Sequence, residues 1–189
     1  MRAFIAVDIH EDARAGLGRV TDQLRRLGGD VKWVPARNVH ITLKFLGETG
    51  EDLVPDLLAA MRAAAAGQSP FRVRLGGLGS FPRKGRPRVV WVGIAEGGRE
   101  LGYLAGWVDS LCCELGFERE KRPFSAHVTV GRVRSPGGIE RLVEALGAGS
   151  DFSTETFEVT SIRLMKSDLR PSGAVYTCVG EVNLGRAAD

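Results

Sequence analysis

The chain has 189 residues, of which 43% are hydrophobic and 26% charged, the composition of an ordinary globular protein that can bury a sizeable core. Its apolar runs are far shorter than a membrane span, and Met1 leads straight into an expected strand without a signal-peptide layout, so we expect a soluble, cytoplasmic protein. The three cysteines lack the spacing of a zinc knuckle or a disulfide framework, and the net charge of +3 permits an anionic partner.

The spacing of apolar residues predicts strands and helices in both halves of the chain. No linker-like or low-complexity stretch separates the halves, so we expect a single domain over residues 1–189, of the α+β class with mainly antiparallel sheets. In chain order, the expected elements are a strand over 3–9, a helix over 11–27, an extended piece over 31–35, a strand around 38–45 that Gly47 ends, a helix over 51–66, strands over 71–81 and 88–94, a helix over 99–115, a strand around 125–132, a helix over 139–146, and strands over 152–166 and 174–182.

Two of the three histidines open nearly identical phrases, His-Ile-Thr-Leu at 40–43 and His-Val-Thr-Val at 127–130. Because side chains alternate across a strand, His40, Thr42 and Lys44 are expected on one face, with His127 and Thr129 arranged likewise in the second phrase. The apolar residues of the first phrase are expected on the other face, at Ile41, Leu43 and Phe45. Each phrase therefore predicts a half-buried strand that offers an imidazole and a hydroxyl.

The similarity extends beyond the histidines at a shift of 86 or 87 residues. Residues 4–7 fall on 91–94, and 71–73 fall on 157–159, with apolar segments in the same order. This pattern favours two similar lobes related by an approximate two-fold, whose polar faces meet in a central groove. Chance self-alignment of a strand-rich chain is the alternative.

Two imidazoles in one groove suit acid–base chemistry, because one can be neutral and the other protonated near pH 6.5. A phosphodiester cleavage needs both, since water must lose a proton and the leaving oxygen must gain one. Threonine hydroxyls can donate to the non-bridging phosphate oxygens. A metal site is the weaker interpretation, because neither phrase holds a third ligand. His10, which has no matching phrase, is expected to be an exposed helix-start residue.

The paired phrases resemble the twin HxTx motifs of the 2H phosphoesterase superfamily, and more specifically its bacterial and archaeal RNA 2′,3′-cyclic phosphodiesterases, also described as 2′-5′ RNA ligases. The resemblance covers nearly the whole chain. One departure is Ala126, where many relatives have proline before the second histidine. The matching context lies at residues 4–8, 33–35, 43–47, 76–82, 122–124, Arg132 and 167–169.

The resemblance implies a two-lobed fold and an enzyme that opens a ribonucleoside 2′,3′-cyclic phosphate to a 2′-phosphate, without metal or cofactor. It implies that His40 protonates the departing O3′, that His127 activates water, and that Thr42 and Thr129 hold the phosphate. The implied substrates are RNA ends, including tRNA fragments, or nucleoside cyclic phosphates, with reversible 2′-5′ ligation in some members. We expect a monomer. Hydrolysis of a small cyclic phosphate such as ADP-ribose 1″,2″-cyclic phosphate, and RNA-end binding without chemistry, are the alternatives.

Three further residues are candidates for substrate binding. Lys44, on the predicted histidine face, would add a positive charge to the site. Arg132 would clamp a phosphate, although alternation points it with Val128 and makes an internal salt bridge an equal option. Ser167 faces the groove or begins a turn. The basic segment 82–88 either follows an RNA backbone or forms a solvated hairpin tip.

Overall fold

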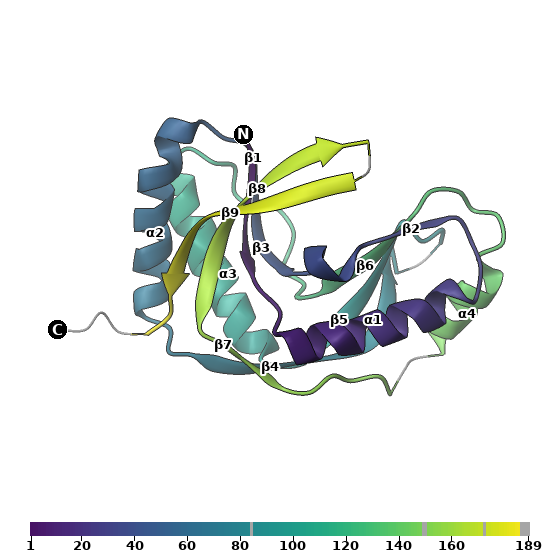
Figure 1. Cartoon of the computed structure of the whole chain (residues 1–189). Helices are drawn as coiled ribbons and strands as arrows, with labels where there is room; N and C mark the ends of the chain where they lie inside the picture. Colours follow the sequence, from purple (N-terminus) through teal and green to yellow (C-terminus); the bar gives the residue numbers. More distant parts are fainter. Residues whose placement is uncertain (84, 149–150, 172, 186–189) are drawn as a thin grey trace.

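The structure is a computed structural model that describes residues 1–83, 85–148, 151–171 and 173–185, so parts of the predicted 82–88 segment and 170–173 turn lie outside the described residues. Its elements follow the predicted order closely (Figure 1). They are β1 (Arg2–Val7), α1 (Glu11–Arg25), β2 (Val31–Trp33), η1 (Ala36–Asn38), β3 (Ile41–Glu48), η2 (Glu51–Leu53), α2 (Val54–Ala66), β4 (Phe71–Phe81), β5 (Val89–Glu96), α3 (Gly98–Glu114), β6 (Val128–Val133), α4 (Glu140–Gly147), β7 (Phe157–Val159), β8 (Ser161–Arg170) and β9 (Gly173–Asn183).

One antiparallel sheet connects both halves, in the strand order β7-β4-β5-β6-β3-β1-β8-β9, with β2 paired to β6. The order is symmetric about the β6–β3 pair, because β5 and β1 flank that pair and β4 and β8 come next. The halves exchange strands: β4 pairs with β5 of the second half, and β8 pairs with β1 of the first half. The predicted α+β fold with two pseudo-symmetric lobes is confirmed.

The helices are exchanged in the same way (Figure 1). The first lobe, formed by β3, β1, β8 and β9, carries α2 and α3, which contact each other and these strands. The second lobe, formed by β6, β5, β4 and β7, carries α1 and α4. Each lobe therefore has one helix from each half of the chain, so neither half forms a lobe alone. None of the helices in the described ranges is long and apolar enough to span a membrane.

The core lies between the sheet and the helices. Ile41 and Val128, which follow the two histidines, are completely buried, as are Ile5 and Leu164 on the neighbouring strands. Burying such a side chain contributes about 1.5–3 kcal/mol, so the strands that carry the histidine phrases are held firmly. Helix α1 begins with acidic residues in its first turn and buries Leu17 and its neighbours, as predicted.

The predicted single strand over 152–166 is wrong. The structure has β7 and β8 there, and these strands lie in opposite lobes: β7 pairs with β4, and β8 pairs with β1. The cause can be read in the side chains, because Phe157 and Val159 are buried at odd positions whereas Ile162 and Leu164 are buried at even ones. This change of phase falls where β7 ends and β8 begins, and the chain crosses between lobes at this point.

Candidate active site

The two histidine phrases meet at one backbone pair, Ile41 opposite Val128, on the central strands β3 and β6. In an antiparallel pair, moving one residue forward along one strand means moving one residue back along the other. His40 is therefore opposite Thr129, and Thr42 is opposite His127. Because Ile41 and Val128 point into the core, all four polar residues face the other side of the sheet. We call this side the site face. The structure thus brings together the four residues that the phrases predict.

Each histidine is oriented by the backbone two residues before it. Nδ1 of His40 lies 2.8 Å from the carbonyl oxygen of Asn38, and Nδ1 of His127 lies 2.7 Å from that of Ser125. A carbonyl oxygen only accepts, so Nδ1 is the protonated nitrogen in both rings. Nε2 remains to exchange a proton with a ligand. Both histidines immediately precede their strands, because β3 begins at Ile41 and β6 begins at Val128.

Aromatic rings support both imidazoles. Phe4 stacks on His40 with ring centroids 4.7 Å apart and Tyr176 meets the same imidazole edge-on at 5.3 Å. On the other side, Phe81 meets His127 edge-on at 5.0 Å, and Trp91 lies 6.5 Å away. The internal repeat in the sequence aligns Phe4 with Trp91. The repeat gave no reason to place Phe81 or Tyr176 at the site, since both come from strands distant in sequence from the histidines.

A network of charged side chains, centred on Asp8, lies beside His40. Asp8 accepts hydrogen bonds from Arg14, at 2.6 Å, and from Arg163. Burial lowers the pKa of His40 from its ordinary 6.5; the hydrogen bond to Asn38 and the charge of Asp8 oppose this shift, whereas the charges of Arg14 and His127 add to it. The same residues enclose a pocket of about 170 Å³ next to His40, lined by Phe4, Ala6, Val7, Asp8, Arg14, Arg37, Asn38, Val39, His40, Arg163, Met165 and Tyr176.

The prediction that Lys44 faces the site is wrong. Its side chain is 5% exposed, and its Nζ lies 2.5 Å from Oδ1 of Asp109 on α3 and 2.8 Å from the carbonyl oxygen of Glu118. The cause is a β-bulge: β1 pairs residue 5 with Lys44 and residue 6 with Thr42, which leaves Leu43 as an extra residue on β3. The bulge inverts the alternation, so Lys44 turns toward the helices.

The same bulge brings Phe45 to the site face, where it lies opposite Phe4 in register, with ring centroids 6.2 Å apart. Phe45 is 67% exposed, against the prediction that it shares a face with Ile41 and Leu43. Sequence alternation could not reveal this, because the inserted residue has no signature in a run of apolar side chains.

Strand β6 repeats the bulge at Val130, because β5 pairs Val90 with Gly131 and Trp91 with Thr129. Gly131 therefore turns inward, where an added Cβ would lie 2.8 Å from a methyl carbon of Val31. Arg132 consequently lies on the site face, exposed and without an ion pair to any other described residue. Of the two predicted options for this arginine, the structure lacks the internal salt bridge and leaves the guanidinium available to a ligand.

Ser167 lies within β8 rather than at a turn, opposite Tyr176 in register. Directly paired residues share a face, so Ser167 lies on the same side as the Tyr176 ring that contacts His40. Thr42 and Thr129 are half-buried, and neither hydroxyl has a hydrogen-bond partner in the part of the chain that the structure describes. In that part, no group of three or more His, Cys, Asp and Glu side chains is arranged to hold a metal ion.

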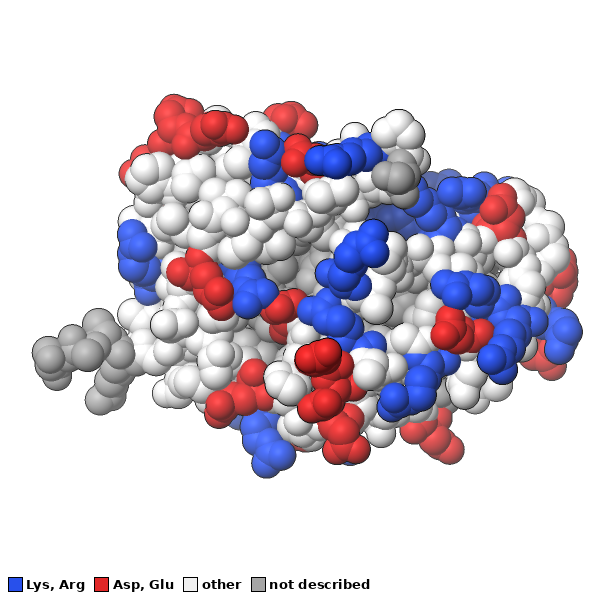
Figure 2. Space-filling model, in the orientation of Figure 1, with Lys and Arg blue, Asp and Glu red and all other residues white. Residues whose placement is uncertain are grey.

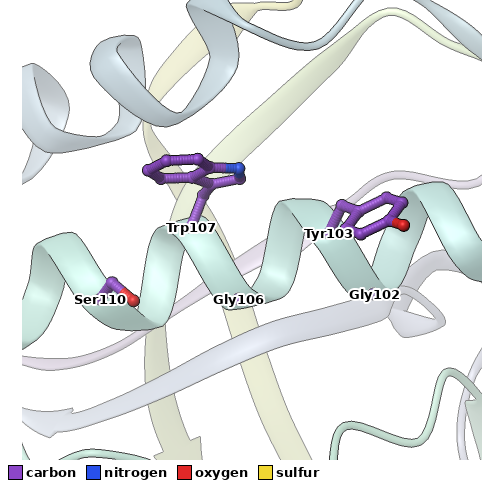
Figure 3. A pocket seen from close by; sticks show the side chains of 5 residues that line it. All are labelled: Gly102, Tyr103, Gly106, Trp107 and Ser110. Atoms are coloured by element: carbon purple, nitrogen blue, oxygen red, sulfur yellow. The ribbon is translucent and has the colours of Figure 1, made fainter.

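A second depression, of about 350 Å³, lies on the outer surface of α3 (Figure 3). It is formed by one stretch of the helix, where the exposed rings of Tyr103 and Trp107 project beside two glycines. Because α3 covers the opposite side of the sheet at Asp109, this depression is separate from the histidines. Its lining residues are Gly102, Tyr103, Gly106, Trp107 and Ser110.

Comparison with known proteins agrees with this geometry. The sequence matches the family described as LigT like Phosphoesterase twice, over residues 7–91 and 92–176. The chain belongs to this family. The two matches begin at residues 7 and 92, a spacing close to the predicted shift of 86 or 87, and each contains one histidine phrase.

Family members similar to this chain cover nearly all of it. A relative from Archaeoglobus fulgidus named RNA 2′,3′-cyclic phosphodiesterase is 39% identical over 179 residues, 93% of this chain and 96% of the relative. The crystal structure of TT0787 from Thermus thermophilus superposes with a TM-score of 0.80 at 32% identity, covering 97% and 98% of the two chains. The crystal structure of E. coli LigT complexed with 3′-AMP has a TM-score of 0.69 at 25% identity and covers 97% of each chain.

Proposed function

We propose that this protein is a phosphoric diester hydrolase that opens 2′,3′-cyclic phosphate ends of RNA to 2′-phosphomonoesters. The observation that carries the proposal is the arrangement around the Ile41–Val128 pair, with two imidazoles and two hydroxyls on one face. The name of the Archaeoglobus relative, and the nucleotide in the E. coli LigT structure, support the same class of substrate. Reversible 2′-5′ ligation is the same displacement with a 5′-hydroxyl of RNA in place of water.

The proposed step is an in-line displacement at phosphorus. Nε2 of His127 takes a proton from water, the water oxygen bonds to phosphorus, the P–O3′ bond breaks, and Nε2 of His40 gives its proton to O3′. Thr42 and Thr129 donate hydrogen bonds to the non-bridging oxygens. The product is a 2′-phosphate with a free 3′-hydroxyl, and proton exchange with solvent restores both histidines.

The charge distribution suits an anionic substrate. Arg132 is on the site face without an ion pair to a described residue, and Arg37 lines the pocket beside His40. Lys and Arg side chains gather more densely on the half of the surface that carries α1 and α4 than on the half that carries α2 (Figure 2). The positive electrostatic potential of this half of the surface attracts a phosphate backbone.

The direct test is incubation with an oligonucleotide that ends in a 2′,3′-cyclic phosphate, with ³¹P NMR to identify the hydroxyl that keeps the phosphate. We expect a 2′-phosphate, at a rate that EDTA does not change. A 3′-phosphate product would contradict the direction of ring opening, and no turnover would contradict the activity. Faster turnover of ADP-ribose 1″,2″-cyclic phosphate than of the oligonucleotide would assign a small-molecule substrate instead.

A further inference from the structure

The short η1 turn that precedes His40 lies between helix α1 and the β8–β9 hairpin (Figure 1). Its last residue, Asn38, supplies the carbonyl oxygen that accepts the hydrogen bond from Nδ1 of His40. The direction of this carbonyl therefore sets the orientation of the imidazole. A displacement of about 1 Å in a catalytic group can cost about 10² in rate, so the groups that hold this turn bear on the reaction.

One arginine holds the turn from the α1 side. Nη1 of Arg14 donates to the carbonyl oxygen of Ala36 at 2.7 Å and to that of Val39 at 3.4 Å. These two hydrogen bonds lie on either side of Asn38 in the chain. Nη2 of the same guanidinium donates to the carbonyl oxygen of Ile9 at 2.9 Å. The planar fork of donors therefore connects the turn to the segment between β1 and α1.

Strand β9 holds the same turn from the other side. Nδ2 of Asn38 donates to the carbonyl oxygen of Ala174, at the start of β9, at 2.8 Å. The backbone around Asn38 is thus held by Arg14, and its side chain is held by β9. The carbonyl that orients His40 is fixed by two elements that lie outside the histidine phrase.

The corresponding turn before His127 has no such support. Nδ1 of His127 bonds to the carbonyl oxygen of Ser125, but within the described ranges no side chain donates a hydrogen bond to the backbone of residues 123–126. Because the same hydrogen bond forms there without an arginine, Arg14 is not needed merely to form the turn before His40. The difference points to a demand for precision at His40.

We propose that Arg14 is a positioning residue for His40, which fixes the Asn38 carbonyl and, through it, the direction of Nε2. This inference rests on the proposed function for its effect on turnover. The Arg14 side chain is only 20% exposed and donates to Asp8 as well as to the three carbonyl oxygens, so its donors are already used within the protein. A lysine at this position would keep the charge but not the fork.

Turnover by double variants tests whether Arg14 acts through His40. We expect Arg14→Met to lower kcat for a 2′,3′-cyclic phosphate by about tenfold with KM nearly unchanged, and Arg14→Lys to recover only part of this loss. In a His127→Ala background, which keeps the His40 imidazole, Arg14→Met should lower the single-turnover rate by a similar factor. In a His40→Ala background it should lower the rate no further, because the imidazole that it positions is gone.

Arg25→Met is the matched control. Arg25 lies on the same helix and pairs with Asp22 at the exposed surface, so its loss should change none of these rates. Equal losses from Arg14→Met in the two histidine backgrounds would show a general structural effect and overturn the proposal. Full recovery of kcat in Arg14→Lys would also overturn it, because the charge would then matter and the fork would not.

Nitrogen NMR of the imidazoles supplies a readout that does not need turnover. At a pH where both rings are neutral, we expect the wild type to hold His40 as the tautomer protonated at Nδ1 and Arg14→Met to populate both tautomers, with His127 unchanged. Asn38→Ala removes the bond to β9 without touching Arg14, so it should act in the same direction and serves as the test if Arg14→Met does not fold. An unchanged His40 tautomer in the folded variants would overturn the proposal. An inactive wild type would contradict the proposed hydrolase, while the tautomers would still decide whether Arg14 orients His40.

Discussion

The two histidines share a backbone arrangement and differ in their surroundings. Both bond through Nδ1 to a carbonyl two residues earlier, and both lie beside the single pair that joins β3 to β6. The Nδ1 hydrogen bond of His40 is partly buried, and its imidazole lies against Phe4 and beside the Asp8 network. The Nδ1 hydrogen bond of His127 is exposed to solvent. The two histidines therefore have the same tautomer, and the side chains around them give them unequal exposure to solvent.

This contrast explains how one motif can serve two roles. A general acid and a general base need the same nitrogen available but opposite protonation states. The repeated turn supplies the nitrogen, and residues outside the motif supply the difference in environment. The roles therefore cannot be assigned from the motif itself, only from what surrounds each copy.

Removing either imidazole should have the largest effect. We expect His40→Ala and His127→Ala each to lower kcat for a 2′,3′-cyclic phosphate by about 10² or more, because each loses one proton transfer. The two variants should differ with a substrate in which sulfur replaces O3′, since a thiolate leaves without a proton. Single-turnover rates should then recover in His40→Ala and stay low in His127→Ala. Recovery in the His127 variant alone would reverse the two roles.

The next largest effect should come from breaking the ion pair between Lys44 and Asp109 that the β3 bulge makes possible, and it should lower stability rather than activity. Lys44→Met leaves the Asp109 carboxylate, which is 17% exposed, without its partner, and we expect a loss of about 3 kcal/mol in the free energy of unfolding. Urea denaturation measures this loss. The pKa of Asp109 is lowered: burial raises it, but the hydrogen bonds from Lys44 and the Glu120 amide outweigh burial. This stabilisation should therefore be present at neutral pH and lost as the pH falls through the lowered pKa.

Activity separates this structural role from a role in the site. Because Lys44 points toward α3, Lys44→Met should leave kcat and KM unchanged at a temperature where the variant is folded. The double variant Lys44→Met/Asp109→Leu should recover much of the lost stability, since no charge is left unpaired. A large rise in KM in the folded single variant would show that Lys44 binds the substrate after all.

Lys44 and Arg132 also show what the sequence could and could not predict. The repeated phrases and their spacing were enough to predict the two lobes, the α+β class and the four central polar residues as one group. Alternation then failed for both Lys44 and Arg132, for one reason. A bulge changes the face of every residue after it, and an extra Leu or Val in an apolar strand is indistinguishable from a regular one.

The exchange of strands between lobes was hidden for a different reason. Period-two patterns predict that a strand exists but not which strand it pairs with. Tyr176 and Arg163 reach His40 because β8 and β9 join the first lobe, although they come from the second half of the chain. The change of phase between Val159 and Ile162 was the one readable sign of that crossing.

The threonines should show a smaller and equal effect. Thr42 lies opposite His127 and Thr129 opposite His40, so the two hydroxyls have equivalent places around the phosphate. Losing a hydrogen bond to a charged group costs about 1.5–3 kcal/mol, so Thr42→Val and Thr129→Val should each lower kcat by about tenfold or more. Thr→Ser at each position keeps the hydroxyl and is the control. A loss confined to one position would show that the phosphate lies off the two-fold axis.

The smallest predicted effect is on the titration of His40. Burial, together with the nearby charge of His127, lowers the pKa of His40 below 6.5, so the free protein holds this ring neutral at pH 7. An acid must be protonated, so the bound phosphate has to supply the negative charge that raises this pKa. We therefore expect the NMR midpoint of His40 to lie below 6.5 in the free protein and to rise when inorganic phosphate is added. The kcat profile should be a bell within about pH 5 to 8.

His127→Ala gives this titration its internal comparison. The charge of His127 lowers the pKa of His40, so removing that imidazole should move the His40 midpoint upward in the free protein. The shift has this sign because a nearby positive charge disfavours a second one, and its removal favours the imidazolium. His10→Ala is the control, since His10 is exposed and paired with Asp12 at the start of α1. An unchanged His40 midpoint in His127→Ala would mean that the two imidazoles do not sense each other, and they would then be too far apart to act on one phosphorus atom.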